Sequence, residues 1–244
     1  MLKDLHRVVA IDGPAASGKS SVARELARRL GFAYVNSGAI YRAITWHVLQ
    51  KAIDPSDTPG VGQALGSVKI ACRLENDNPR IFINDADPTD RLHEDRVNEA
   101  VSRVSRVPSV RGIVVRKMRD YARSYDLVVE GRDIGSVVFP DTPYKFYIDA
   151  SPDVRLQRRA AQGQRDEIAA RDLADSSRLA SPLVVARDAS VIDTSNLTID
   201  QVVGMQRSEA EQLAPYGRNH HKSQQGKGDR GDPHERAICL ADEL

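Results

Sequence analysis

Short runs of apolar residues alternate along this chain with longer segments in which apolar residues recur at the spacing of a helix. Valine and isoleucine are frequent in the short runs, which is typical of strands buried on both faces of a parallel sheet. The pattern predicts strands over 7–12, 33–36, 127–130, 145–149 and 190–193. It predicts helices over 19–30, 39–51, 108–124, 152–161 and 199–213. We therefore expect an α/β fold with helices on both faces of a parallel sheet and ligands beyond the carboxyl ends of its strands.

The apolar period changes between about residues 67 and 90. Apolar residues then alternate with other residues, at Val68, Ile70, Cys72 and Leu74, before a turn-rich segment over 76–79 and a second short apolar run over 80–84. A period of two on both sides of a turn predicts an antiparallel hairpin. Two arrangements fit this pattern: a small subdomain inserted into the α/β fold, or an extension of the edge of the main sheet.

A glycine-rich loop joins the first predicted strand to the first predicted helix. It reads Gly13-Pro14-Ala15-Ala16-Ser17-Gly18-Lys19-Ser20, followed by Ser21. Between a strand and a helix, this spacing of glycines lets successive N–H groups face one phosphate at the positive end of the helix dipole. We expect a nucleoside triphosphate here, with Lys19 at its β- and γ-phosphates and the Ser20 hydroxyl on Mg²⁺. An ordinary tight turn would fit the glycines alone, so the flanking elements carry this inference.

Composition and charge narrow the class of protein. The 244 residues suffice for one large domain or for a domain with a modest insertion. Thirty-five Lys and Arg residues against 34 Asp and Glu residues give a formal charge of +1, so no global field attracts nucleic acid or a membrane surface. Cys72 and Cys239 lie far apart, without the spacing of a disulfide framework or a zinc site. We expect a cytoplasmic protein that binds neither a membrane nor a nucleic-acid polymer.

Residues 215–244 show no usable periodicity and few apolar residues. Such a segment buries too little apolar surface to offset the entropy of ordering it, so we predict a disordered tail. The adjacent His220 and His221 invite a metal interpretation, but no third ligand stands in register, which favours simple solvation.

Arginine is concentrated between residues 155 and 178, where no lysine occurs. The arginines are Arg155, Arg158, Arg159, Arg165, Arg171 and Arg178, and Arg42 and Arg132 follow two strand ends. Guanidinium groups bind phosphate oxygens in bidentate fashion, which suits a site for two anionic substrates. A solvated helix face with surface ion pairs is the alternative for Arg158 or Arg159, but it does not explain Arg42 and Arg132.

Four segments together resemble the bacterial cytidylate kinases, which are P-loop nucleoside monophosphate kinases. They are the glycine-rich loop, Ser37-Gly38-Ala39-Ile40-Tyr41-Arg42, the segment from Glu130-Gly131-Arg132-Asp133 to Pro140, and the segment from Arg171-Asp172 to Arg178. The resemblance runs from about residue 7 to residue 213. It implies a P-loop NTPase fold and ATP-dependent phosphorylation of CMP and dCMP. It also implies one kinase domain over 1–214, with a small antiparallel CMP-binding insert over about 67–90 plus the following helix, and an arginine-bearing lid over about 159–175.

The resemblance also assigns residues to the acceptor nucleotide. Ser102, Arg111 and Asp133 would contact the base, and their chemistry agrees, because a carboxylate accepts from the cytosine amine while donors meet its O2 and N3. For Ser102 alone, a serine on a helix surface is the simpler explanation. Arg42, Arg132 and Arg178 would hold the acceptor phosphate, and Arg171 and Asp175 would lie near the sugar. Ser37, Tyr41 and Gly131 complete the implied acceptor site.

The implied mechanism needs no general base, because a CMP phosphate oxygen is already ionised near neutral pH. Lys19, Mg²⁺ and the lid arginines Arg155 and Arg159 would neutralise the transferring phosphoryl group, together with Arg132 and Arg178. Nucleotide kinases of this sort are often monomers, so we expect a monomer. Two departures are visible: Asn36 stands where relatives commonly carry Asp, and Ala174 stands where some carry Arg.

Because Asn36 brings no charge, the metal would depend more on Ser20 and Glu130, with Asn36 acting only through water. Two other functions remain open from the residues. One is a related small-molecule kinase acting on UMP, AMP or a shikimate-type acceptor. The other is a nucleotide-dependent switch that hydrolyses ATP slowly and signals through its shape.

Overall fold

A computed structural model describes residues 6–75, 78–161, 172–173, 175–177 and 182–213. Most of the predicted lid lies outside these residues, and so does the predicted tail over 215–244. Arg165, Arg171 and Arg178 are also outside the described part of the chain. Within the described part, no helix is both long enough and apolar enough to cross a lipid bilayer.

The core is one five-stranded sheet in which every neighbouring pair of strands is parallel. Its strands are β1 (Val8–Asp12), β2 (Ala33–Asn36), β5 (Leu127–Gly131), β6 (Tyr144–Asp149) and β7 (Ser190–Asp193). They lie in the order β2-β5-β1-β6-β7. Because the chain moves from β1 to one side and later returns to the other, β1 marks the switch point where ligands bind in such sheets.

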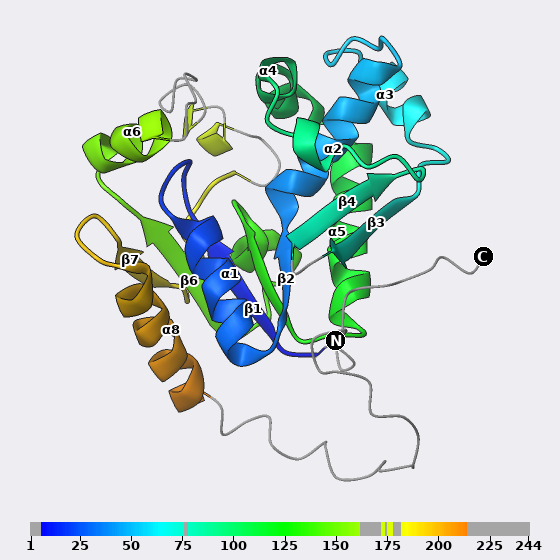
Figure 1. The fold of residues 1–244 in the computed structure, drawn as a ribbon. Coiled ribbons are helices and arrows are strands. Elements are labelled where there is room, and N and C mark those ends of the chain that lie inside the picture. The colour runs from blue at the N-terminus through cyan, green and yellow to red at the C-terminus, as the bar shows by residue number, and fades with distance from the viewer. Residues whose placement is uncertain (1–5, 76–77, 162–171, 174, 178–181, 214–244) are drawn as a thin grey trace, which may run out of the picture.

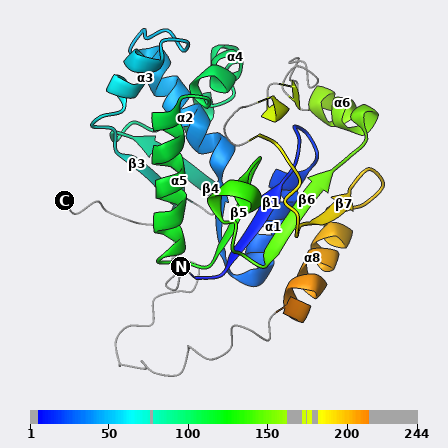
Figure 2. The same cartoon turned by 180° about the vertical axis from the view of Figure 1, so that it is seen from behind.

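Side chains of β1 alternate between two hydrophobic clusters, as the period of a strand requires. Val8 and Ala10 belong to one cluster, whereas Val9 and Ile11 belong to the other. Figure 1 shows α1 (Lys19–Leu30) and α8 (Ile199–Leu213) on the near face of the sheet. Figure 2 shows α5 (Pro108–Ala122) on the opposite face, where α2 (Ser37–Gln50) also packs. The predicted α/β fold is therefore confirmed.

Local sequence explains where these helices begin and end. Val22, Ala23, Leu26 and Ala27 give α1 an apolar stripe at spacings of three and four, and the left-handed Gly31 ends it. The Asn36 side chain accepts from the Ala39 N–H, so α2 begins at Ser37, two residues before the predicted start. Every strand and helix predicted above lies within two residues of its observed bounds.

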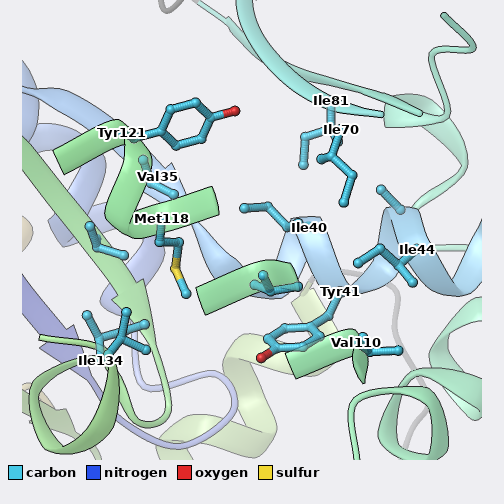
Figure 3. Close-up of a cluster of buried hydrophobic side chains, with 14 of the residues drawn as sticks. Val35, Ile40, Tyr41, Ile44, Ile70, Ile81, Val110, Met118, Tyr121 and Ile134 are labelled. Carbon is cyan, nitrogen blue, oxygen red and sulfur yellow. The ribbon is translucent and has the colours of Figure 1, made fainter. Parts of the chain in front are cut away.

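The predicted hairpin is present and forms a sheet of its own, so it does not extend the edge of the main sheet. β3 (Ile70–Glu75) pairs antiparallel with β4 (Asn78–Ile83). Ile70, Ile81 and Ile83 pack into the cluster that holds α2 and α5, as Figure 3 shows for Ile70 and Ile81 beside Ile40 and Ile44. The hairpin is thus fixed to one side of the sheet by apolar contacts.

Several shorter elements complete the described chain. They are α3 (Thr58–Ala64), the 3₁₀ turn η1 (Thr89–Arg91), α4 (Asp95–Val104), the π-helical turn η2 (Ile134–Val138) and α6 (Pro152–Ala161). The helix expected after the hairpin is α4. The sequence pattern missed α3, because a proline and two glycines lower its helix propensity and only Val61 is buried. It also missed η2, which follows directly on the site described below.

One polar contact joins the hairpin to α5. The Cys72 N–H donates to the Tyr121 hydroxyl at 3.1 Å, and Tyr121 is 1% exposed. We expect Tyr121→Phe to leave this N–H without a partner and to lower the free energy of unfolding by about 1–3 kcal/mol. Chemical denaturation would measure the loss, and hydrogen exchange of the Cys72 amide would localise it. Tyr144→Phe in the main sheet is the matched control. Equal stability of the two variants would contradict the role of this contact.

Candidate active site

A cleft of about 780 Å³ opens at the carboxyl ends of the central strands. This volume is within the range of small-molecule sites. Many of the residues predicted above line it: Ala15, Ala16, Gly18, Lys19, Ser20, Ser21, Asn36, Ser37, Tyr41, Arg42, Ser102, Glu130, Gly131, Arg132, Asp133, Arg159 and Asp175. Gly13, Pro14 and Ser17 belong to the glycine-rich loop. Arg111 donates to Asp133, which lines the cleft, and Arg155 donates to Asp172. Arg171 and Arg178 lie outside the described residues.

The glycine-rich loop requires its glycines for two different reasons. A Cβ atom on Gly13 would lie 2.0 Å from the Ile148 carbonyl oxygen, so no side chain fits where the loop passes β6. Gly18 has φ +92° and forms the N-cap of α1, a conformation that other residues rarely adopt. Both constraints hold the loop in a tight curve over the end of the sheet.

The amino end of α1 is suited to an anion. Its first turn contains no acidic residue, and no side chain caps it. The Ser17 hydroxyl is buried without a hydrogen-bond partner, and the Ala15 N–H donates to an Asp172 carboxylate oxygen at 3.3 Å. The helix dipole favours negative charge at this end, so the first turn of α1 is suited to an anion such as phosphate.

Lys19 places a buried amine in the loop. The side chain donates to the Pro14 carbonyl oxygen at 2.8 Å, and the residue is 7% exposed. Burial, with a smaller contribution from the charge of Arg132, lowers the pKa of Lys19 to about 7. A bound phosphate would favour the charged form again, so the cost of burying Lys19 is relieved by the ligand that the loop suits.

Glu130 links the loop to the end of β5. One carboxylate oxygen accepts from the Ser20 hydroxyl at 2.8 Å and the other from the Tyr34 hydroxyl at 2.5 Å. Mg²⁺ prefers oxygen ligands such as hydroxyl and carboxylate groups, so the side chains of Ser20 and Glu130 fit this metal. The described residues hold no group of three acidic, histidine or cysteine side chains for a metal, so phosphate oxygens and water would complete its coordination.

A buried ion pair faces the loop from the other side of the cleft. Arg111 on α5 donates to Asp133, and the two residues are 7% and 4% exposed. The Arg111 guanidinium also lies 5.8 Å from the centroid of the Tyr41 ring. Ser102 on α4 lines the same side of the cleft. This wall therefore offers one carboxylate, one guanidinium and one hydroxyl within a largely dry environment.

Three further arginines gather where the two sides meet. Arg132 donates to the Asp175 carboxylate at 2.7 Å, and Arg42 donates to the Asn98 side chain at 3.1 Å. Arg159 is buried and lines the cleft. The planar guanidinium group can donate two parallel hydrogen bonds to two oxygens of one phosphate group.

Arg155 and Arg158 bind the glycine-rich loop itself. Arg155 donates to the Ala15 carbonyl oxygen at 3.3 Å and to Asp172. Arg158 donates to the Ser17 carbonyl oxygen at 3.1 Å and to that of Thr194 at 2.9 Å. Arg158 is therefore not part of a solvated face with surface ion pairs, and it braces the loop against the end of β7.

Three residues that the sequence analysis did not single out also shape the site. Asp12 accepts from the Ile134 and Gly135 N–H groups, both at 2.8 Å, and burial raises its pKa to about 6. Thr194 donates to the Ser17 carbonyl oxygen at 2.9 Å, and Tyr34 binds Glu130 as described above. A signal existed for two of them: Asp12 is an acid at the end of an apolar strand, and Tyr34 shares a strand face with Asn36.

Comparison with known proteins places this cleft in a wider context. Residues 9–212 match the family model described as cytidylate kinase. A cytidylate kinase of Pelotomaculum thermopropionicum is 42% identical over 210 residues, which cover 81% of this chain and 92% of that protein. A cytidylate kinase of Mycobacterium avium is 42% identical over 223 residues, covering 86% and 98%. One of Mycobacterium leprae is 43% identical over 208 residues, covering 80% and 92%.

The buried charge of Lys19 leads to a prediction about stability. Below about pH 7 the folded protein holds a charged, desolvated amine. Between about pH 7 and the ordinary lysine pKa of 10.5, Lys19 is protonated in the unfolded chain but neutral in the folded protein. The free energy of unfolding therefore rises with pH in this range. We expect Lys19→Met to raise the free energy of unfolding of the ligand-free protein by roughly 3 kcal/mol at about pH 6. The gain should shrink as the pH rises and vanish only well above 10.5, where the lysine is neutral in both the folded and the unfolded states.

Calorimetric melting at several pH values would measure this gain, at about 2–4 °C for each kcal/mol. Lys69→Met, at an exposed lysine, is the control and should change little. If the melting temperature of Lys19→Met at about pH 6 is lower than that of the parent, then burying the charged Lys19 amine does not destabilise the folded protein.

Proposed function

The chain belongs to the cytidylate kinase family, and on this premise we propose that it transfers the γ-phosphoryl group of ATP to CMP and dCMP. The products would be ADP and CDP or dCDP. The observation that carries the proposal is the pairing of two unlike walls in one cleft. A glycine-rich loop suited to phosphate faces a buried Arg111–Asp133 pair suited to a polar base.

The acceptor wall matches cytosine by its hydrogen-bonding groups. Cytosine presents an amine donor beside the acceptors N3 and O2, and Asp133 can accept from the amine while Arg111 and Ser102 donate. Uracil reverses the donor and acceptor at this edge. It would leave buried polar groups unmatched at a cost of about 1–3 kcal/mol each. The related kinase acting on UMP is therefore the less favourable alternative.

The acceptor phosphate would be the nucleophile. Its second pKa of about 6 leaves it ionised near neutral pH, so the chain needs no general base. Arg42 and Arg132 would hold this phosphate, with Arg178 as a further predicted ligand. Asp175 orients Arg132 and, with Arg171, would lie near the sugar. Holding the two phosphates in line accounts for most of the acceleration in phosphoryl transfer.

The donor side would bind the triphosphate of ATP through main-chain amides of residues 13–21. Lys19 would leave the Pro14 carbonyl and meet the β- and γ-phosphates, where its charge stabilises the developing negative charge. Arg155 and Arg159 would add charge from α6. A bound Mg²⁺ would neutralise further phosphate charge, and Ser20 and Glu130 are the residues that would hold it, with Asn36 contributing through water.

We also propose a monomer that acts on small molecules in the cytoplasm, without nucleic-acid or membrane partners. The near-neutral net charge supports this view. The division into one kinase domain over 1–214 with a lid over about 159–175 belongs to the same proposal, and residues 215–244 lie outside the described part of the chain. Light scattering of the full chain would test the monomer.

The substrate proposal predicts the outcome of an acceptor panel. With ATP and Mg²⁺ present, we expect rapid ADP release with CMP and dCMP, and at least tenfold lower kcat/KM with UMP, because each unmatched buried group costs about 1–3 kcal/mol. AMP, GMP and shikimate should give only background release. Rapid turnover with another acceptor would select a related kinase, and no acceptor dependence would select a nucleotide-dependent switch.

Two changes in the acceptor wall should separate base recognition from folding. Ser102→Ala removes one donor and should lower kcat/KM for CMP about five- to tenfold with no loss of stability. Asp133→Ala should remove the preference for CMP over UMP. It should also cost about 3–5 kcal/mol of stability, because Arg111 is left buried and unpaired. An equal loss for CMP and UMP in both variants, measured by kinetics beside melting curves, would contradict base recognition here.

A further inference from the structure

Tyr34 lies behind Glu130 and is not among the residues that line the cleft. It stands on β2, whereas Glu130 ends β5 and Ser20 begins α1. The Tyr34 hydroxyl donates to one Glu130 oxygen at 2.5 Å, and the Ser20 hydroxyl donates to the other at 2.8 Å. Glu130 is 2% exposed, so water has little access to this carboxylate. Each oxygen of a buried carboxylate is thus fixed by a hydroxyl from a different element.

The chemistry of the tyrosine suits this role. A tyrosine hydroxyl ordinarily loses its proton only at about pH 10, so Tyr34 can donate to Glu130 across the physiological range. Asn36 lies on the same strand face, and its side-chain oxygen accepts from the Ala39 N–H to cap α2.

The Ser20 hydroxyl has one proton and two lone pairs. When it gives the proton to Glu130, its lone pairs remain available for a cation. That arrangement requires Glu130 to present the correct oxygen, yet the terminal torsion of a glutamate is broad and selects no orientation by itself. Only the second hydrogen bond, from Tyr34, fixes the plane of the carboxylate.

We propose that Tyr34 is a positioning residue for the divalent cation: it locks Glu130 so that Ser20 donates its proton inward and offers its lone pairs to the metal. The inference rests on the proposed function for the presence of a metal–nucleotide complex. Tyr34 itself touches neither nucleotide nor metal and acts through Glu130. Tyr34, Glu130 and Ser20 thus form one chain of hydrogen bonds that would end at the cation.

The test uses the full chain and the change Tyr34→Phe, which removes the hydroxyl and nothing else. Titration calorimetry with ADP, in EDTA and in excess Mg²⁺, gives two dissociation constants. We call their ratio, the factor by which Mg²⁺ tightens ADP binding, the metal factor. We expect the affinity for metal-free ADP to stay within about twofold of the parent and the metal factor to fall about tenfold, the equivalent of one buried hydrogen bond. Tyr144→Phe is the matched control and should leave both quantities unchanged.

A kinetic measurement should agree. The Mg²⁺ concentration that gives half the maximal rate should rise about tenfold, while kcat at saturating Mg²⁺ and KM for CMP stay near the parent values. In a Ser20→Ala background, Tyr34→Phe should no longer change the metal factor, because the two residues act on the metal through the same carboxylate. Full additivity of the two changes would overturn the proposal.

Two other outcomes would also overturn it. An unchanged metal factor would show that the hydroxyl does not orient Glu130 for the cation. An equal loss of ADP affinity with and without Mg²⁺ would assign Tyr34 a merely structural role. Should Tyr34→Phe fail to fold by circular dichroism, Tyr34→Met also removes the hydroxyl while filling the space with a flexible apolar side chain, and it should lower the metal factor about tenfold. No change there would refute the inference. Because ADP binding needs no acceptor, the result stands apart from whether CMP is the substrate.

Discussion

The close passage of the glycine-rich loop over β6 is the constraint on which the rest of the site depends. A methyl group at Gly13 would overlap the Ile148 carbonyl oxygen, so the chain must turn at that point with bare backbone. The turn directs main-chain amides into the cleft and brings α1 to it by its amino end. Asp12, one residue earlier, binds two amides of the turn after β5 and thereby joins the donor wall to the segment that carries Arg132 and Asp133.

The two walls of the cleft are supported by different hydrophobic clusters. The cluster on one face of the sheet holds α1 and α8 and supports the phosphate loop. The cluster on the other face holds α2, α4, α5 and the hairpin, and it supports the acceptor wall. Because β1 contributes alternate side chains to both, the strand fixes the distance between the two walls. The hairpin thus stabilises the acceptor side without contributing the residues that would read the base.

The site also concentrates buried charge, which is costly for a folded chain. Lys19, Asp12 and the Arg111–Asp133 pair are all largely removed from water. Desolvation of such groups seldom favours the folded state, and their pKa values move accordingly for Lys19 and Asp12. Lys19 is the one of these groups whose burial a substrate can relieve, because a phosphate bound in the same cleft would supply its missing counter-charge.

The amino-acid sequence was sufficient to predict the fold class, the sheet strands, the long helices and the loop that suits phosphate. These features follow from local patterns, because apolar period and glycine position act within a few residues. It also determined, through the resemblance, the family and the acceptor residues to examine. It did not determine α3 or η2, whose own residues are poor helix formers and which depend on neighbours for their shape.

The polar groups that share a proton or a charge could be identified only from the packed structure. That Arg158 braces the loop, that Asp12 holds the turn after β5 and that Tyr34 orients Glu130 are contacts between residues far apart in the chain. No spacing in the sequence encodes such a contact, because hydrogen bonds depend on distances of a few ångströms that arise only after strands and helices have packed.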